Sequence, residues 1–323
     1  MKYFNIVHIS LTPLVAAPGK MAKLQREFGH NACCIVLNDY PSKGPLANKF
    51  LDDSILFTKE MTPFIENSIR QADIIHIHNN CPIDKAQLIN RLNQKTKFIY
   101  HVHSPLREGP LFLDRTQDMG IVFDDFLVVG QHWPKLYPNY KPVPNIIFHT
   151  PSINLRQKGE KLRIAYSPTH QHIGKWTSKH CQELNDTINS LSSLGLIELI
   201  RPESPVHPNT LMYMRRYCHL TIDEIATGGY HQVSLEGLCA GNIVINGADY
   251  FGKKVLANFC ENVDPPFIHA HSSNIAEVIT RFVQSEELTR EWQTKSLEYF
   301  QKYLLPSRLI HIYNAIYEKL YEN

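Results

Sequence analysis

The chain has 323 residues, more than the roughly 100–200 typical of one domain, so two domains are expected. Hydrophobic residues make up 43% and charged residues 20%, an ordinary balance for a globular chain that can build a core. The 33 Lys and Arg against 31 Asp and Glu give a net charge of +2, which argues against a strongly basic nucleic-acid binder.

Two features of the sequence bear on the compartment. No apolar run approaches the roughly 18 residues that a membrane span needs, and Asn5 and His8 interrupt the apolar start, which predicts a first strand and not a signal peptide. The seven cysteines include one close pair, Cys33 and Cys34, and no Cys-x-x-Cys, so neither a disulfide framework nor a zinc knuckle is expected. We therefore predict a reduced, cytoplasmic protein.

Short apolar runs alternate with amphipathic stretches through the first half of the chain, which is typical of βα units and a parallel sheet. The expected strands are 4–9, 32–37, 72–78, 97–102 and 122–129. The expected helices are 20–28, 64–71 and 85–92. Four prolines follow at 134–144, and with the polar stretch 154–161 they predict a stiff, extended linker between two domains.

The second half of the chain starts the same pattern again. The expected strands are 162–166, 197–200, 219–222 and 243–246. The expected helices are 179–194, 208–217, 234–240, 275–285, 287–303 and 308–321. The pattern predicts an α/β protein with two doubly wound parallel-sheet domains facing each other across a cleft. Ligands of such sheets bind beyond the carboxyl ends of the strands, so the loops that follow strands are candidate sites.

The most informative segment is 222–245, which reads as a strand, a glycine loop, a short helix and another strand. Gly228 and Gly229 let the loop approach a ligand closely, and the helix that follows directs its N-terminal amides at a phosphate. Glu236, expected in the first turn of that helix, is suited to accept hydrogen bonds from a ribose diol. An equal interpretation is a turn followed by a glutamate that stabilises the helix dipole.

Segment 228–245 resembles the donor-binding signature of retaining glycosyltransferases with the GT-B fold, in the glycogen-synthase-like (group 1, family 4-like) clan. In that family the segment binds a nucleotide sugar, and its second glutamate, a ribose clamp, falls on Glu236. The family's first glutamate falls on Gly228, and His231 stands where the family commonly has glycine.

Further segments resemble the family in the same order along the chain. They are 72–80, 100–107, 142–146, 164–169 and 175–177. The resemblance implies that Lys175 neutralises the donor diphosphate, for which a lysine point charge is suited, although a surface lysine is the alternative. It also implies that His103 lies beside the donor sugar and that the C-terminal helix crosses back to the first domain.

The resemblance defines the predicted site. The predicted catalytic residues are His103, Lys175 and Glu236. The predicted donor-binding residues are Gly19, Ser167, Thr169, Gly228, Gly229, Tyr230, His231, Ser234 and Leu235. His78 and Arg107 are predicted on the acceptor side of the cleft. For Gly19, which precedes a helix in Pro18-Gly19-Lys20, a simple turn is a comparable interpretation.

Seventeen histidines are the oddity of the composition. His76 and His78 share one strand face, as do His101 and His103, because side chains alternate along a strand. Such pairs suit Zn²⁺, but no Cys or carboxylate has a supporting spacing. An Asp-x-Asp in the context of a sugar site is also absent from the sequence. We therefore expect no metal and no cofactor, with the nucleotide sugar as co-substrate.

Together these features predict a metal-independent, retaining GT-B glycosyltransferase of polysaccharide biosynthesis. The expected domains are 1–150 for the acceptor side, 151–303 for the donor and 304–323 for the helix that packs back. The predicted partners are a nucleotide-diphosphate sugar and a glycan or lipid-linked acceptor, without nucleic acid. Membrane association and the oligomeric state stay open. A nucleotide-sugar epimerase or phosphorylase of the same fold, or a non-catalytic sugar-nucleotide-binding subunit, are the alternatives.

Overall fold

The computed structural model describes residues 2–39, 51–104, 116–168, 171, 178–203 and 206–322. The chain divides into two compact units, and each is described by itself. Unit 1 comprises Met1–Ile146 and Pro306–Asn323, and unit 2 comprises Ile147–Leu305. The C-terminal segment therefore belongs to unit 1, although unit 2 precedes it in the sequence.

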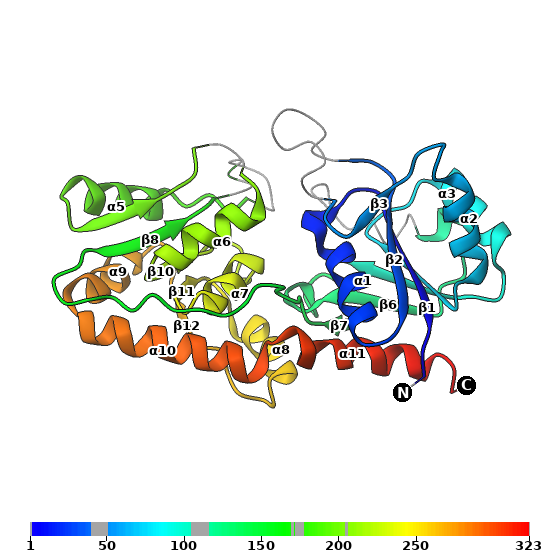
Figure 1. The fold of residues 1–323 in the computed structure, drawn as a ribbon. Helices are drawn as coiled ribbons and strands as arrows, with labels where there is room; N and C mark the ends of the chain where they lie inside the picture. Colours follow the sequence, from blue (N-terminus) through cyan, green and yellow to red (C-terminus); the bar gives the residue numbers. More distant parts are fainter. Residues whose placement is uncertain are drawn as a thin grey trace. The chain divides into compact units, whose positions relative to one another are not determined.

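Unit 1 is built around a parallel sheet (Figure 1). Its strands are β1 (Asn5–Ser10), β2 (Asn31–Val36), β3 (Ser54–Leu56), β4 (Ile74–His78), β5 (Lys97–Val102), β6 (Asp125–Val129) and β7 (Lys141–Val143). Its helices are η1 (Leu14–Ala16), α1 (Ala17–Glu27), α2 (Thr62–Gln71), α3 (Ile83–Leu92), η3 (Gly130–His132) and α11 (Pro306–Lys319). The strand order among the described residues is β3-β2-β1-β4-β5-β6-β7.

The two faces of this sheet differ in chemistry. One face is apolar, because Val7 of β1, Ile75 of β4 and Tyr100 of β5 pack in one core with Ile69 of α2 and Ile89 of α3. The residues that alternate with them point to the other face and include a series of histidines. Hydrogen bonds join that second face to α1 and α11. Both faces of β4 are buried, and in β1, β4 and β5 the second face carries histidine in place of the aliphatic residues usual in a parallel sheet.

Unit 2 contains a second parallel sheet, with helices packed against it (Figure 1). Its strands are β8 (Leu162–Tyr166), β9 (Ile197–Ile200), β10 (Leu220–Ile222), β11 (Ile243–Asn246) and β12 (Phe267–His269). Its helices are α5 (Gln182–Ser193), α6 (Pro208–Tyr217), α7 (Gln232–Cys239), α8 (Tyr250–Phe259), α9 (Ile275–Gln284) and α10 (Glu286–Tyr303). The strand order among the described residues is β12-β11-β10-β8-β9. The predicted α/β class with two doubly wound parallel sheets is confirmed.

Several element boundaries differ from the sequence prediction. The proline-rich stretch was expected to be irregular, but β7 includes Pro142. This strand lies at the edge of the sheet, where proline is tolerated because one side of the strand needs no ladder hydrogen bond. The pattern also missed β3 and β12, since three-residue strands carry too few alternations to recognise, and it missed the helix α8.

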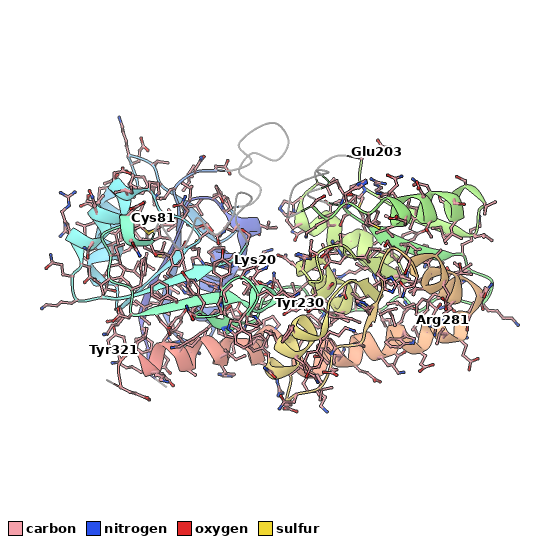
Figure 2. The ribbon with its side chains drawn as sticks, turned by 180° about the vertical axis from the view of Figure 1, so that it is seen from behind. Lys20, Cys81, Glu203, Tyr230, Arg281 and Tyr321 are labelled. Atoms are coloured by element: carbon pink, nitrogen blue, oxygen red, sulfur yellow. The ribbon has the colours of Figure 1, made fainter. Side chains whose placement is uncertain are left out.

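The helix α11 is anchored to unit 1 by tyrosines. Tyr321, labelled in Figure 2, stacks on Phe4 with ring centroids 5.2 Å apart, and its hydroxyl donates to the carbonyl of Asp73 at 2.6 Å. Tyr313 donates to the carbonyl of Pro144 at 2.8 Å. These contacts pack the apolar stripe of α11 into unit 1. No helix in the described ranges is long and apolar enough to span a membrane.

Candidate functional site

The glycine loop predicted from the sequence lies at the carboxyl end of β10. The chain leaves the sheet at Ile222, runs through the loop and enters α7 at Gln232. Gly228 has a φ of +74°, a left-handed conformation that glycine adopts without strain. The helix therefore begins where ligands of parallel sheets bind, with its N-terminal amides at the loop.

Two acidic residues that the sequence interpretation did not single out hold this loop. Asp223 accepts hydrogen bonds from the backbone amide of His231 at 2.7 Å and from the Ser234 hydroxyl at 2.8 Å. Glu224 accepts from the amides of Ala226 at 2.6 Å and Thr227 at 2.8 Å. Both carboxylates are almost fully buried, so they fix the backbone of the loop and do not face solvent.

The pKa of the Asp223 carboxyl lies well below its usual value. Burial by itself raises that pKa, but the interaction with His231 and the hydrogen bonds from His231 and Ser234 outweigh it. Nδ1 of His231 lies 3.3 Å from the Asp223 carboxylate. Asp223 thus stays ionised, and the start of α7 is held by a fixed negative charge close to its N-terminal amides.

Glu236, the predicted ribose clamp, is part of a buried ion pair. Its carboxylate lies 2.9 Å from Nη1 of Arg215 and accepts from Gln232 at 2.8 Å. Nη2 of Arg215 donates to the hydroxyl of Ser167, another predicted donor-binding residue, at 3.1 Å. One buried guanidinium therefore connects two of the predicted site residues, and the Glu236 carboxylate that it pairs with is itself buried.

The position of Glu236 in its helix corrects one interpretation. The helix was expected to start at Ser234, which would place Glu236 in the first turn as a partner of the helix dipole. Because α7 starts at Gln232, Glu236 is its fifth residue and the first turn contains no acidic residue. The counter-charge of Glu236 is Arg215 and not the helix N-terminus.

Other predicted donor-binding residues occupy different environments. The side chains of Tyr230 and Leu235 are buried in the core of unit 2, so only their backbone is suited to contact a ligand. Gly19 was expected in a loop, but it lies in the first turn of α1, where a Cβ would come within 2.4 Å of the Ser54 hydroxyl. Lys175, Thr169 and Arg107 lie outside the described residues.

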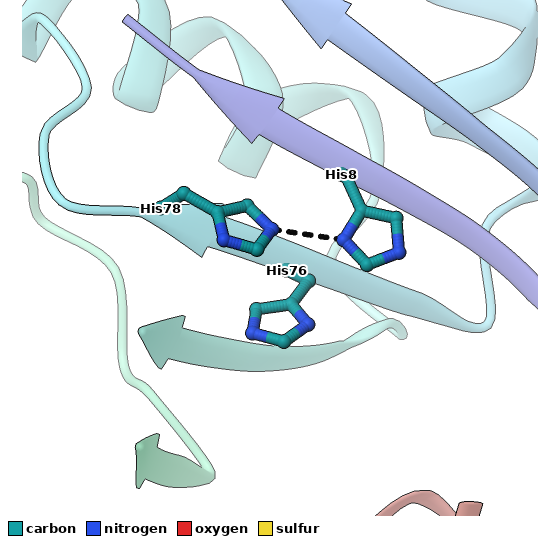
Figure 3. A group of neighbouring side chains, drawn as sticks. All are labelled: His8, His76 and His78. Carbon is teal, nitrogen blue, oxygen red and sulfur yellow. Dashed lines mark hydrogen bonds between the residues drawn. The ribbon is translucent and has the colours of Figure 1, made fainter. Parts of the chain in front are cut away.

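The second group of predicted residues lies in unit 1, where histidines of three neighbouring strands meet. Register pairs His8 of β1 with His76 of β4, and His78 of β4 with His101 of β5. His103 follows β5 directly. Figure 3 shows His8, His76 and His78 on adjacent strands, with the hydrogen bond between His8 and His78 dashed.

Hydrogen bonds and stacking join these rings. Nδ1 of His8 lies 2.8 Å from Nε2 of His78, and Nδ1 of His78 lies 2.7 Å from Nε2 of His103. The rings of His76 and His78 stack at 4.4 Å between centroids. His103 is partly exposed and its backbone amide donates to the Asn79 side chain at 2.7 Å. The cluster thus extends from the buried sheet face to the carboxyl ends of the strands.

Burial keeps these histidines neutral. It lowers the pKa of His8 from 6.5 to about 4, although the hydrogen bond to Gln25 opposes the change. Burial and the neighbouring rings hold the pKa values of His76, His78 and His101 well below 6.5. The imidazoles therefore act as neutral donors and acceptors at physiological pH.

The cluster brings together two groups of three histidines whose nitrogens lie within 4.8 Å of one another. They are His8, His76 and His78, and His78, His101 and His103. Within each group two nitrogens are already hydrogen-bonded at 2.7–2.8 Å. The rings of neighbouring pairs lie at 20–43° to each other. In this conformation the cluster is a hydrogen-bonded stack.

No family model matches the chain, and no curated protein matches it. Solved structures do resemble it. An alpha-glucosyltransferase in complex with UDP-glucose and DNA has a TM-score of 0.67 at 12% identity, over 98% of this chain and 100% of the other. A glycosyltransferase from Rickettsia africae has a TM-score of 0.56 at 15% identity, over 100% of this chain and 99% of the other. A UDP-forming trehalose-phosphate synthase from Burkholderia xenovorans has a TM-score of 0.56 at 12% identity, over 98% of this chain and 99% of the other.

At these identities the likeness shows the fold. The chain has two parallel α/β sheets in the GT-B architecture of these glycosyltransferases, along essentially its whole length. The fold class expected from the sequence resemblance is therefore confirmed. Function has to be argued from the site, because one fold hosts many activities.

The structure adds functional candidates that the sequence interpretation missed. Asp223 and Glu224 follow a strand directly, so the rule that sites lie beyond strand ends would have found them. Arg215 carried no such signal, because an arginine in the last turn of a helix is usually solvated. Gln25 and Tyr317 read as ordinary helix residues until the fold joins them to the histidines.

Proposed function

We propose that the protein is a glycosyltransferase that moves a sugar from a nucleotide-diphosphate sugar to a glycan, lipid-linked or other acceptor. The GT-B fold and the resemblance of segment 228–245 to a donor-binding signature support the proposal. Retention of anomeric configuration and independence of metal ions are parts of the same proposal and rest on the sequence resemblance. The seven cysteines, all free, support a cytoplasmic location.

The observation that carries the proposal is the loop between β10 and α7. The loop lies at the carboxyl end of a parallel strand, and Gly228 and Gly229 let its backbone approach a ligand. The amides at the start of α7 suit a diphosphate, because a helix N-terminus offers donors and a positive dipole end, and the ionised Asp223 beside them offsets part of that positive charge. Asp223 and Glu224 fix this backbone before a ligand binds, so ordering of the loop costs little binding free energy.

The proposed chemistry breaks the bond between the anomeric carbon and the β-phosphate oxygen of the donor. The electron pair goes to the phosphate oxygen, and the acceptor hydroxyl forms the new glycosidic bond and gives up its proton to the departing diphosphate. Lys175 and the loop amides stabilise the charge that develops on the leaving diphosphate. His103 hydrogen-bonds the sugar as the bond breaks, and Glu236 holds the ribose.

A panel of nucleotide sugars tests the proposal. UDP-, GDP-, ADP- and CMP-sugars are each added, and the melting temperature is compared with that in the matching nucleoside. A ligand at about 100 times its Kd stabilises the folded protein by about 2.7 kcal/mol, enough for a clear shift. One nucleotide family should raise the melting temperature far more than its nucleoside. If none of the four does so, the donor site is wrong.

Independence of metal ions is tested with the donor found in this panel. Turnover is measured with and without EDTA, which should leave the rate unchanged because Lys175 supplies the positive charge at the diphosphate. Loss of activity in EDTA that added Mg²⁺ or Mn²⁺ restores would contradict a metal-free mechanism.

A non-catalytic sugar-nucleotide-binding subunit is the second candidate, and one observation favours it. Gly228 stands where the resembling family has its first glutamate, and its φ of +74° is a conformation that a glutamate adopts only with strain. The loop is therefore built for glycine and lacks that carboxylate. Donor hydrolysis or product formation distinguishes the two, since a binding subunit shows thermal stabilisation by nucleotide without turnover.

A further inference from the structure

A continuous chain of hydrogen bonds connects His103 to the interior of unit 1. Starting from the strand end, the bonds run from His103 to His78 at 2.7 Å and from His78 to His8 at 2.8 Å. Nε2 of His8 then meets Oε1 of Gln25 on α1 at 2.7 Å. The amide nitrogen of Gln25 donates to the hydroxyl of Tyr317 on α11 at 2.9 Å. All four partners of His103 in this chain are buried.

The orientation of the Gln25 amide determines where each proton lies. Because Oε1 of Gln25 only accepts, Nε2 of His8 carries the proton and Nδ1 of His8 accepts. Nε2 of His78 must then donate to His8, which leaves Nδ1 of His78 as an acceptor. Nε2 of His103 therefore donates to His78. Each ring is neutral and each hydrogen bond has one donor. All three bonds therefore donate in the same direction, from His103 towards Gln25.

Tyr317 hydrogen-bonds the amide nitrogen of Gln25. Its hydroxyl accepts from the amide of Gln25 at 2.9 Å and lies 3.1 Å from Nδ1 of His76, which accepts the hydroxyl proton when His76 is protonated on Nε2. A reversed amide would need every proton in the chain to move to the other nitrogen of its ring.

We propose that Gln25 is a positioning residue that fixes the tautomer of His103. It acts through His8 and His78, with Tyr317 orienting its amide. His103 then has its proton on Nε2, directed inward, and Nδ1 makes no hydrogen bond within the described part of the chain. Nδ1 therefore carries a lone pair that can accept a hydrogen bond from a ligand at the carboxyl end of β5.

This assignment specifies the ligand group that His103 recognises. A lone pair on Nδ1 accepts a hydrogen bond, so the group must be a donor such as a sugar hydroxyl, and a carboxylate at the same position is rejected. The use of His103 on a sugar rests on the proposed function. The tautomer itself does not, because it follows from the hydrogen bonds of unit 1 alone.

Nitrogen NMR on the full-length protein labelled with ¹⁵N-histidine tests the tautomer without any ligand. Long-range ¹H–¹⁵N correlations distinguish a ring protonated on Nε2 from one protonated on Nδ1, and the variant His103→Asn identifies the His103 signals. We expect His8, His78 and His103 each as the Nε2–H form. Observation of His103 as the Nδ1–H form overturns the proposal.

Variants test whether Gln25 is the cause. In Gln25→Met and in Tyr317→Phe the His103 signals should shift from the Nε2–H form to an average of two tautomers. Gln25→Glu should restore the Nε2–H form, because a carboxylate oxygen also accepts from His8. Tyr313→Phe is the matched control. It also removes a buried tyrosine hydroxyl from α11, but that hydroxyl donates to the backbone carbonyl of Pro144, which is not part of the hydrogen-bond series from His103 to Tyr317.

The outcomes separate this proposal from the proposed function. If His103 keeps one tautomer in both Gln25→Met and Tyr317→Phe, Gln25 does not position it and the proposal fails, whatever the enzyme does. Should Gln25→Met fail to fold, Tyr317→Phe carries the test, since it deletes a single oxygen. With a donor from the nucleotide panel, Gln25→Met should lower turnover about tenfold, the value of one hydrogen bond, with unchanged nucleotide affinity. Absence of nucleotide binding would contradict the proposed function and leave the tautomer result intact.

Discussion

The buried histidines predict that unit 1 is unstable in mild acid. His8, His76, His78 and His101 are fully buried, and burial lowers the pKa of each, in His8 to about 4. The unfolded chain has ordinary histidines that bind protons below about pH 6.5. Between pH 6.5 and 4 the unfolded state therefore binds more protons than the folded state, and stability falls as the pH falls.

The size of this effect follows from the number of groups. Each of the four histidines costs about 1.4 kcal/mol at pH 5.5 and about 2 kcal/mol at pH 5. Together they remove about 8 kcal/mol at pH 5, which is comparable to the 5–15 kcal/mol that holds a typical domain folded. Among the described residues of unit 2, His219 is of this kind, since burial lowers its pKa to about 4. Unit 1 should therefore unfold near pH 5, before unit 2.

Thermal denaturation between pH 7.5 and 4.5 measures this effect by circular dichroism. The slope for unit 1 should reach at least about 5 kcal/mol per pH unit below pH 6, the value for these four protons, and His103, whose pKa burial lowers to about 3, steepens it further. His101→Leu should reduce that slope by about 1.4 kcal/mol per pH unit, because one titrating group is lost and the ring of His101 makes no hydrogen bond to the described residues. A stability that stays flat from pH 7 to 5, or an unchanged slope in His101→Leu, would refute the reasoning.

Four further predictions concern the proposed site and its support. Lys175→Ala should weaken binding of a nucleotide diphosphate far more than of its nucleoside in calorimetry, and equal losses would contradict the phosphate role. Glu236→Gln should weaken nucleotide binding. It should also lower the melting temperature of unit 2, because the buried Arg215 loses its counter-charge, which costs about 3–5 kcal/mol of folding stability. Unchanged nucleotide affinity would exclude the ribose contact. His103→Ala should lower turnover more than tenfold with nucleotide affinity nearly intact, a result that full turnover would overturn. Gly237→Ala should destabilise unit 2 by about 1–3 kcal/mol in urea denaturation, because the new Cβ would lie 2.8 Å from a side-chain carbon of β11. An unchanged denaturation midpoint would show that the surrounding side chains move to accommodate the new methyl group.

The sequence by itself determined most of the secondary structure of the sheets. The predicted strands 97–102, 162–166, 197–200 and 243–246 and the helix 208–217 have the bounds that the structure gives them. These elements are recognisable because a parallel strand buried on both faces is a short apolar run between polar turns. The resemblance of segment 228–245 likewise located the glycine loop before the fold was known.

Tertiary structure alone decided which side chains meet. Gln25 and Tyr317 are 292 positions apart in the sequence, and they join only because α1 and α11 both cover the histidine face of one sheet. The sequence showed His76 and His78 as a pair, but His8 enters the cluster through the strand order, which periodicity does not encode. The partner of Glu236 is a similar case, since the side chain of Arg215 turns inward from the end of its helix. Local pattern fixes backbone conformation, whereas the order of strands and the packing of helices fix the chemistry of a site.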